Sequence, residues 1–483
     1  MKFKEVKFPL LSALFLWINL IDKELAEWET VANFVSAFLY FRVLVSALER
    51  GFFSFCVSCS FSIWINQVWL VTTISNYSNI HLFFSILVFF GYGVLNFGLS
   101  VILFFINKIF SRFGILSLPL AWTCWESLNL QLFDWKAGYL FFSTEFIPAI
   151  SSLCGSSLLS FLLLAFVCLS KRSRSGIIFS TLILILELSL RLFSSVYQTK
   201  ELNALLVQPN HSLENKHNVL KISELINDVK DLIKPKLHDA DLVILPESVV
   251  YYFFPQDKLD LKKDPVFNHL ALGKNLVFGA LTKQNSNYYN SVILVDEKNE
   301  PVGIYNKMIL MPFGEFMPFR KVLSFVLPFH PIEDFSTGLA MNVFELAGVR
   351  ISALICYEDL YPSLSVEAVL KGAELLLVVS NDLWFGRKFV PALHDRFAGF
   401  RAVEAGITLV RVSNAGYTSV FSPRGTRTIL LEPNKAEARL EKIKLEKINV
   451  PAKFLMKPFE LGIKILLVVL LVYFFFNELL KLR

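Results

Sequence analysis

Charged residues are scarce in this sequence. Only 18% of its 483 residues are Asp, Glu, Lys or Arg, whereas 54% are hydrophobic and 48 are phenylalanine. Long, nearly charge-free blocks fill most of residues 1–197, and this composition excludes a simple soluble protein. Residues 198–459 have the mixed composition of a globular domain. We therefore predict a membrane domain over 1–197, a globular domain over 198–459, and a last membrane helix with a short cytoplasmic tail over 460–483.

Cysteine is almost absent from the globular part. Five of the six cysteines lie in the apolar blocks, and Cys356 is the only one within residues 198–459. That domain therefore cannot form an internal disulfide. No second cysteine or suitably spaced histidine pair accompanies Cys356, so we expect no metal site and no cofactor. A buried, inert thiol and a reactive thiol both fit this observation taken alone.

Apolar runs long enough for a membrane helix, about 20 residues, recur along the chain. We count seven candidate spans before the globular part and an eighth after it, at about 9–21, 30–48, 52–73, 80–107, 113–133, 146–169, 176–196 and 460–476. The first run could also be a signal peptide, because Lys2, Lys4 and Lys7 precede it. No small-residue cleavage pattern follows, which favours an uncleaved membrane helix.

Lysine and arginine are unevenly divided between the short loops. If the N-terminus is cytoplasmic, the segments on that side hold eleven of these residues, whereas the opposite side holds only Lys23 and Lys136. Because basic residues of short loops prefer the cytoplasm, residues 198–459 are expected outside the cytoplasmic membrane. The net charge of +6 is then largely a topology signal, and we expect no nucleic-acid partner.

Short apolar runs alternate with longer periodic segments in the globular part. The runs expected as strands are 204–208, 242–246, 275–280, 291–296, 349–358, 375–381, 407–414 and 418–422. The segments expected as helices are 220–236, 364–371 and 392–405. This alternation predicts a layered α/β domain. The run LLLVVS at 375–380 is apolar on both faces, which is typical of a strand in the middle of a sheet.

Three of the expected strands end on residues able to do chemistry. Glu247 follows DLVILP, Lys307 follows GIYN, and Cys356 follows VRISALI. Taken singly, they could be a neighbour of a helix cap, a loop charge and a core residue. The carboxyl ends of strands in α/β sheets are, however, the usual place for a site, so their joint arrangement suggests a common function.

A cysteine acts as its thiolate and needs a base or a nearby cation, because its free pKa is near 8.5. The histidines of the globular part stand in no evident motif. Glu247 could take the thiol proton if burial raises its pKa. Lys307 could stabilise the thiolate and then the developing oxyanion. The three residues would supply a base, an electrostatic stabiliser and a nucleophile.

Four segments in order resemble the nitrilase superfamily: LPES at 245–248, YNKMILMPFGEFMP at 305–318, ICYED at 355–359 and NDLWFG at 381–386. The superfamily uses a glutamate, a lysine and a cysteine in this chain order. The resemblance implies an αββα sandwich, with Glu247 as general base, Lys307 as oxyanion-stabilising lysine and Cys356 as nucleophile. The residues that it suggests for substrate binding or support are Glu315, Tyr357, Glu358, Trp384 and Phe385.

Seven membrane helices before such a domain and one after it are similar to one branch of that superfamily, the apolipoprotein N-acyltransferases. The resemblance implies transfer of an acyl chain from a membrane phospholipid, through a thioester on Cys356, to the N-terminal diacylglyceryl-cysteine amine of lipoproteins. It also implies a multi-pass protein of the bacterial inner membrane with a periplasmic catalytic domain. The sequence departs from the branch at Leu245, where an aromatic residue is common, and in lacking a tryptophan soon after Gln208.

Two other functions stay open on the sequence. A membrane-anchored hydrolase of amides or esters would use the same three residues with water as acceptor. A transporter or scaffold with an inactive outer domain would have no reason to keep all three. His394 and Arg401 lie in a helix-like stretch and are candidates for structural support of the site.

Overall fold

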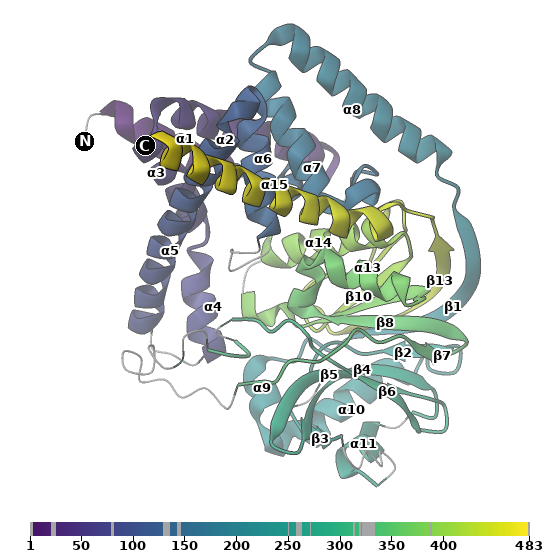
Figure 1. Ribbon diagram of the computed structural model, residues 1–483. Helices are drawn as coiled ribbons and strands as arrows, with labels where there is room; N and C mark the ends of the chain where they lie inside the picture. The colour runs from purple at the N-terminus through teal and green to yellow at the C-terminus, as the bar shows by residue number, and fades with distance from the viewer. Residues whose placement is uncertain are drawn as a thin grey trace. The chain divides into compact units, whose positions relative to one another are not determined.

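The computed structural model divides into two compact units, which we name the helical unit and the α/β unit (Figure 1). The helical unit comprises Met1–Thr72, Leu82–Ser194 and Val450–Arg483, and the α/β unit comprises Thr73–His81 and Ser195–Asn449. The residues that the structure describes are 3–20, 26–78, 82–128, 136–142, 146–249, 251–256, 263–270, 272–312, 314–317, 320, 334–385 and 389–481.

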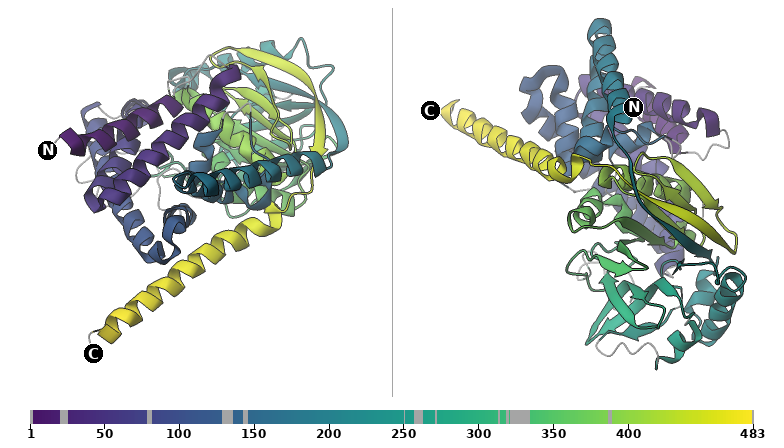
Figure 2. Two further views of the ribbon diagram at one scale, coloured as in Figure 1. Left: turned by 90° about the horizontal axis from the view of Figure 1, so that it is seen from above. Right: turned by 90° about the vertical axis from the view of Figure 1, so that its right-hand side faces the viewer.

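The helical unit consists of apolar helices joined by short segments. Its helices are α1 (Phe3–Leu20), α2 (Ala26–Arg50), α3 (Phe52–Asn66), α5 (Leu82–Ile109), η1 (Phe110–Leu116), α6 (Ser117–Ser127), η2 (Ala137–Phe141), α7 (Ser151–Leu169), α8 (Ser173–Phe193) and α15 (Ala452–Lys481). A further helix, α4 (Trp69–Ser78), includes residues of both units. Both views of Figure 2 show α8 and α15 as long, single helices.

Large apolar side chains project from these helices. The exposed fractions reach 74% for Val94 in α5, and 77% and 83% for Leu192 and Phe193 at the end of α8. Water-soluble proteins rarely leave such extended apolar surface uncovered, whereas hydrocarbon chains of lipids solvate it well. The helical unit therefore has the surface of a membrane protein.

Four helical segments among the described residues are long and apolar enough to cross a membrane: Val31–Arg50, Leu82–Ser127, Ser151–Leu169 and Arg174–Phe193. The expected count of eight spans is thus not confirmed. α3 has only 15 residues, which is short for a bilayer core, and the first turns of α1 carry Lys4, Glu5 and Lys7. The last expected span lies within α15, and the side chains at the end of that helix are outside the described part.

The α/β unit contains two sheets. The strands are β1 (Tyr197–Gln208), β2 (Leu242–Ile244), β3 (Phe253–Pro255), β4 (Asn275–Gln284), β5 (Asn287–Val295), β6 (Pro301–Asn306), β7 (Phe344–Leu346), β8 (Val349–Ile355), β9 (Leu375–Ser380), β10 (Leu409–Ser413), β11 (Thr418–Phe421), β12 (Arg427–Leu431) and β13 (Glu437–Lys447). The helices are α9 (Leu213–His217), η3 (Val219–Lys221), α10 (Ile222–Ile233), α11 (Pro265–Leu270), η4 (Cys356–Leu360), α13 (Pro362–Leu370), η5 (Asp382–Phe385) and α14 (Phe389–Ala405).

Each sheet has a parallel centre. The first runs in the order β13-β1-β2-β4-β5-β6, with β3 beside β4, and the second in the order β12-β11-β10-β9-β8-β7. Strands β1, β2 and β4 are parallel in the first sheet, and β8, β9 and β10 are parallel in the second. The carboxyl ends of the parallel strands within each sheet therefore lie at one edge, which is where α/β folds place their sites.

The sheets and helices form four layers. One apolar core joins the two sheets, and it includes Ile244 and Val292 from one and Leu354 and Val378 from the other. A second core lies between the first sheet and the helices α10 and α11, while α13 and α14 pack against the second sheet. Figure 1 shows this order of helices, sheet, sheet and helices. The α/β unit therefore has the layered α/β fold that the sequence pattern predicts, in the αββα order that the resemblance implies.

The sequence explains why these elements form. The buried residues of α10 recur at helical spacing, at Ile222, Leu225, Ile226, Val229 and Ile233, so one stripe of the helix faces the sheet. All six residues of β9 are buried, which confirms that LLLVVS is a central strand.

Candidate active site

Glu247 lies in the loop that follows β2. Ser248, the next residue, has a left-handed backbone with φ 45°, which is uncommon for a residue other than glycine and turns the chain sharply. Gly279 of β4 passes so close that a Cβ atom there would lie 2.5 Å from the Cα of Glu247. The turn and the missing side chain together hold the Glu247 backbone against the sheet, and its side chain is buried.

Lys307 directly follows β6 and is also buried. Its Nζ lies 2.9 Å from both carboxylate oxygens of Glu315 and 3.7 Å from Oε1 of Glu247. Asn290 of β5 joins the two acids, because its Nδ2 donates at 2.7 Å to Oε1 of each. The main-chain N–H of Met311 donates to the other oxygen of Glu315 at 2.7 Å. Two carboxylates, one ammonium and one amide thus form a single buried network.

Cys356 stands at the turn between β8 and η4 and is 4% exposed. Its φ of 49° is left-handed, which costs on the order of 1 kcal/mol or more for a residue with a side chain. Pro362 begins α13 shortly afterwards, at a position where proline suits the first turn of a helix. Backbone strain of this kind, held by a buried strand and the helices after it, fixes where the thiol points.

The charges of the site act on one another. Burial raises the pKa of the Cys356 thiol well above its usual value, Glu247 raises it further and Lys307 lowers it in part. Burial also raises the pKa of Glu247, against the opposing effect of Lys307. For Lys307, burial lowers the pKa, but the two carboxylates more than offset this, so the pKa is above its usual value. The thiol is protonated at rest, the ammonium is a fixed cation, and the glutamate is a stronger base than usual.

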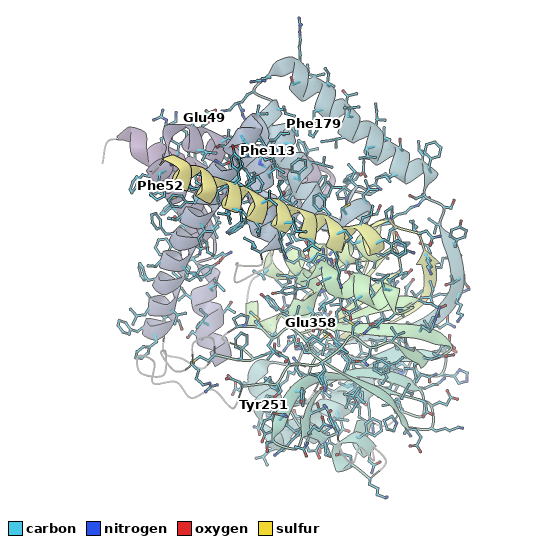
Figure 3. All side chains as sticks on the ribbon, in the orientation of Figure 1. Glu49, Phe52, Phe113, Phe179, Tyr251 and Glu358 are labelled. Atoms are coloured by element: carbon cyan, nitrogen blue, oxygen red, sulfur yellow. The ribbon has the colours of Figure 1, made fainter. Side chains whose placement is uncertain are left out.

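Glu358 ties the cysteine loop to the lysine loop. Its Oε1 accepts hydrogen bonds from the Tyr305 hydroxyl at 2.8 Å and from the N–H groups of Met308 and Ile309 at 2.7 and 3.2 Å. Its Oε2 accepts from the N–H of Ile355 at 2.8 Å, the residue before the cysteine. Glu358, labelled in Figure 3, is fully buried. It therefore sets the positions of two site residues without reaching the thiol.

The other residues that the resemblance suggests have different positions. Tyr357 is buried, and its hydroxyl accepts a hydrogen bond from Tyr361 at 3.1 Å. Trp384 and Phe385 lie in η5, directly after β9, but their side chains fall outside the described part of the structure. The structure thus brings together Glu247, Lys307 and Glu315, links Glu358 to them, and leaves the two aromatic residues as sequence-based expectations.

A second buried network lies beside the cysteine loop. Nη2 of Arg411 donates to both oxygens of Asp382, at 3.0 and 2.8 Å. Nδ1 of His394 lies 3.0 Å from Asp382, and its Nε2 lies 2.9 Å from Asp359 of η4. Burial lowers the pKa of His394, but the two aspartates outweigh it and raise the pKa to about 9. Arg401, expected like His394 as a structural support of the site, also contacts Asp359: its Nη1 donates to the Asp359 carbonyl at 2.9 Å.

Three residues of the two networks are missing from the sequence-based predictions. Asn290 lies in a polar tetrapeptide, NYYN, at the start of β5. Lys216 is 3% exposed, and its Nζ donates to the main-chain oxygen of Glu247 at 3.2 Å. Asp382 begins η5 within the segment NDLWFG. The motif could have pointed to Asp382, whereas Asn290 and Lys216 are recognisable only once β5 and α9 place them next to Glu247.

This arrangement can carry out nucleophilic acyl transfer. In such a reaction the thiol of Cys356 would be the nucleophile. Glu247 has an oxygen, Oε2, without a hydrogen-bond partner among the described residues, and the Lys307 ammonium lies 3.7 Å from its other oxygen. Such a set can accept a thiol proton and stabilise the negative charge of a tetrahedral intermediate.

Comparison with known proteins agrees with this chemistry. The carbon-nitrogen hydrolase family matches residues 204–449, more than half of the chain. An apolipoprotein N-acyltransferase of Shewanella oneidensis is 31% identical over 347 residues, which cover 66% of this chain and 65% of that protein. The protein of the same name from Wigglesworthia glossinidia brevipalpis is 29% identical over 387 residues, which cover 74% of this chain and 76% of that protein.

Other similarities are shorter. An apolipoprotein N-acyltransferase of Geobacter metallireducens is 34% identical over 197 residues, which cover 38% of this chain and only 36% of that protein. The chain thus spans less than two thirds of the length of the first curated relatives that it matches. A solved amidase from Nesterenkonia sp. aligns with 53% of this chain and 94% of its own length, at 20% identity and a TM-score of 0.36. The match over residues 204–449 shows that the chain belongs to the carbon-nitrogen hydrolase family.

Proposed function

We propose that this protein is a membrane-bound apolipoprotein N-acyltransferase that uses Glu247, Lys307 and Cys356. The observation that carries the proposal is the single buried site in which Glu247 and Lys307 act on the Cys356 thiol. The apolar helices of the same chain support a substrate that resides in the bilayer. The similarity to proteins named apolipoprotein N-acyltransferase supports the acceptor.

The first half-reaction loads the enzyme. The Cys356 thiol gives its proton to Glu247 while its sulfur attacks the ester carbonyl of a phospholipid acyl chain. The oxyanion that forms faces the ammonium of Lys307. When the ester C–O bond breaks, Glu247 returns the proton to the leaving alkoxide. The products are a thioester on Cys356 and a lysophospholipid.

The second half-reaction unloads it. The α-amino group of a diacylglyceryl-cysteine, at the N-terminus of a lipoprotein, attacks the thioester carbonyl. The new N–C bond forms, the C–S bond breaks, and Glu247 takes the surplus proton from nitrogen and gives it to the sulfur. A covalent intermediate allows one site to hold two bulky lipids in turn.

The membrane location follows from the same proposal. Both substrates are anchored in a bilayer, so a catalytic unit attached to apolar helices can meet them without extracting them into water. The distribution of Lys and Arg between the short loops favours a periplasmic position for residues 198–459. We therefore place the protein in the bacterial inner membrane, with phospholipid as donor and diacylated lipoprotein as acceptor.

Intact-mass spectrometry tests the first half-reaction. The full chain in detergent is mixed with a phospholipid of defined acyl length, and the mass is measured before and after. We expect a gain of one acyl group, removable by neutral hydroxylamine as a thioester is, and no gain in Cys356→Ala. A well-folded preparation that gains no acyl group would overturn the mechanism. The hydrolase alternative differs only in the fate of this adduct.

A further inference from the structure

Lys216 is a buried lysine that the mechanism above does not use. It lies in the short helix α9, is 3% exposed and donates from Nζ to the main-chain oxygen of Glu247 at 3.2 Å. That carbonyl precedes Ser248, where the left-handed backbone turns the chain out of the sheet. A buried ammonium needs a partner of opposite charge or several acceptors. Glu247 supplies Lys216 with an acceptor oxygen on its main chain and with the negative charge of its carboxylate.

Positive charge is in short supply at Glu247. Lys307 is 2.9 Å from both oxygens of Glu315 but 3.7 Å from the nearest oxygen of Glu247. It is therefore shared unequally between two carboxylates, and Glu315 has the larger share. Oε2 of Glu247 has no hydrogen-bond partner among the residues that the structure describes. With Lys307 alone, two ionised glutamates would leave one uncompensated negative charge in a buried site, and the cheapest relief would be protonation of Glu247.

We propose that Lys216 is a positioning residue for Glu247: it holds the main-chain carbonyl and supplies the second positive charge that keeps the Glu247 carboxylate ionised between turnovers. The charges that act on the Glu247 carboxylate are then Lys216 and Lys307 on one side and Glu315 on the other, so the two lysines balance the two glutamates. Lys216 contacts neither the sulfur nor a substrate, so it acts through the base. The inference concerns the same site as the proposed function and rests on the role of Glu247 in it.

The other charged groups near Lys216 and Glu247 do not replace this charge. His211, in the loop before α9, is buried, and burial together with Lys216 lowers its pKa to about 4, so its imidazole is neutral. Asp228 of α10 lies 3.6 Å from His211 and is more than half exposed. The other charges that act on Glu247 are Lys307 and Glu315, and the uncharged Asn290 donates a hydrogen bond to it.

The charge on Lys216 is itself held weakly. Burial lowers its pKa to about 8, against the opposing effect of Glu247. The lysine is therefore a cation at neutral pH and becomes neutral in mildly alkaline solution. The effect of Lys216 on the ionisation of Glu247 should be greatest at and below neutral pH, where the lysine is charged, and should decrease above pH 8.

Alkylation of the thiol tests the inference without any acyl substrate. The full chain in detergent reacts with iodoacetamide between pH 5 and pH 9, and peptide mass spectrometry follows the modification of Cys356. Sulfur displaces iodide while Glu247 takes the thiol proton, so the acid limb of the rate reports ionisation of the base. In Lys216→Met we expect its midpoint to rise by about one pH unit, with about a tenfold lower rate below it and convergence with the wild type near pH 9.

Three further variants separate the charge from the other roles of the side chain. Lys216→Gln keeps a donor for the Glu247 carbonyl without the charge and should shift the midpoint as Lys216→Met does. Lys216→Arg keeps the charge and should therefore leave the midpoint at its wild-type pH. Lys221→Met is the matched control, because it removes a neighbouring lysine whose ammonium donates to the Asn215 side chain.

An unchanged midpoint in both uncharged variants would overturn the proposal. A wild-type midpoint in Lys216→Gln, together with a raised midpoint in Lys216→Met, would also overturn the proposal. It would show that Lys216 acts only as a hydrogen-bond donor. Loss of folding in both, with Lys216→Arg folded, would assign the residue to stability. Because no acyl donor or acceptor is present, these outcomes are distinct from a failure of acyl transfer.

Discussion

Buried carboxylates occur in both units, and they are used differently. In the helical unit, Glu187 of α8 accepts from the N–H groups of Ala149 and Ile150, at 2.9 and 3.0 Å, and pairs with Arg191 at 2.7 Å. Both of its oxygens are engaged. In the α/β unit, Glu247 accepts one hydrogen bond from Asn290, and its second oxygen has no partner among the described residues.

The difference separates structure from chemistry. Glu187 compensates the free N–H groups that precede α7, where a negative charge is favourable. Glu247 is buried to a similar degree but keeps an oxygen without a hydrogen-bond partner among the described residues. Burial of a charge is therefore not a sign of function in this molecule. An acceptor left available beside a nucleophile is a better sign.

The largest effect on the rate of Cys356 acylation should follow substitution of Glu247, whose second oxygen is available as an acceptor. Glu247→Gln keeps the shape of the side chain and removes the base, so we expect the rate of Cys356 acylation to fall by roughly 10²- to 10⁴-fold. The thermal midpoint of the protein should change little. Single-turnover acylation and a thermal shift assay measure the two effects, with the exposed Glu297→Gln as control. A rate within a few-fold of the wild type would refute the role of Glu247.

Substitution of Glu358, which positions other site residues, should have a smaller effect on the rate of Cys356 acylation than substitution of Glu247. Glu358→Gln places an amide N–H₂ group among four donors from Tyr305, Met308, Ile309 and Ile355. We expect acylation to slow by roughly 10- to 100-fold, because the cysteine and lysine loops lose their common anchor. The thermal midpoint should fall as well, unlike that of Glu247→Gln. Glu367→Gln in α13 serves as the control, and equal thermal midpoints for Glu358→Gln and the wild type would contradict the anchoring role.

Substitution of Glu187 in the helical unit should have the opposite outcome to Glu247→Gln, with a loss of stability but not of acylation rate. Glu187→Gln leaves two N–H groups and Arg191 without their charged acceptor, so we expect a loss of stability of about 1–3 kcal/mol. The rate per folded molecule should stay within about twofold of the wild type, because the chemistry does not use this residue. Thermal inactivation in detergent and the acylation rate of the folded fraction measure the two quantities. A selective loss of rate would break the comparison between the units.

The smallest effect concerns the second buried network. The pKa of His394 is raised to about 9 in the folded protein from an ordinary value near 6.5. The stabilisation by its charge is therefore fully present below pH 6.5 and is lost as the pH rises through 9. We expect the gap in thermal midpoint between the wild type and His394→Gln to narrow from pH 6 to pH 9.5. A gap that stays constant over this range would show that the charge of His394 does not contribute.

The sequence predicts the fold well where patterns are local. The apolar run of β9 and the helical spacing in α10 were sufficient to place both elements. β13 is harder, because its sequence EARLEKIKLEK alternates only roughly and its burial is irregular. β6, which leads to Lys307, has only six residues, and two of them, Pro301 and Gly303, are of types that are uncommon in strands. Such strands are determined by their partners in the sheet and not by their own composition.

The site shows the same division. Glu247, Lys307 and Cys356 stand at strand ends in recognisable segments, so the sequence is sufficient to propose them. Asn290 and Lys216 contact Glu247 from β5 and α9, and the segments that hold them carry no motif. Their role follows from their proximity to Glu247 in the folded protein, which local patterns in the sequence do not predict.

The fate of the acyl group on Cys356 tests the central claim most directly. The full chain is first loaded from a phospholipid with an isotopically labelled acyl chain and freed from excess donor. A synthetic diacylated lipopeptide with a free N-terminal amine is then added, and both the protein and the peptide are weighed. The account predicts that the label leaves Cys356 and appears in amide linkage on the peptide, and that an N-acetylated peptide leaves it in place. Release of labelled free fatty acid, at the same rate with or without the peptide, would contradict the account and identify the protein as a hydrolase.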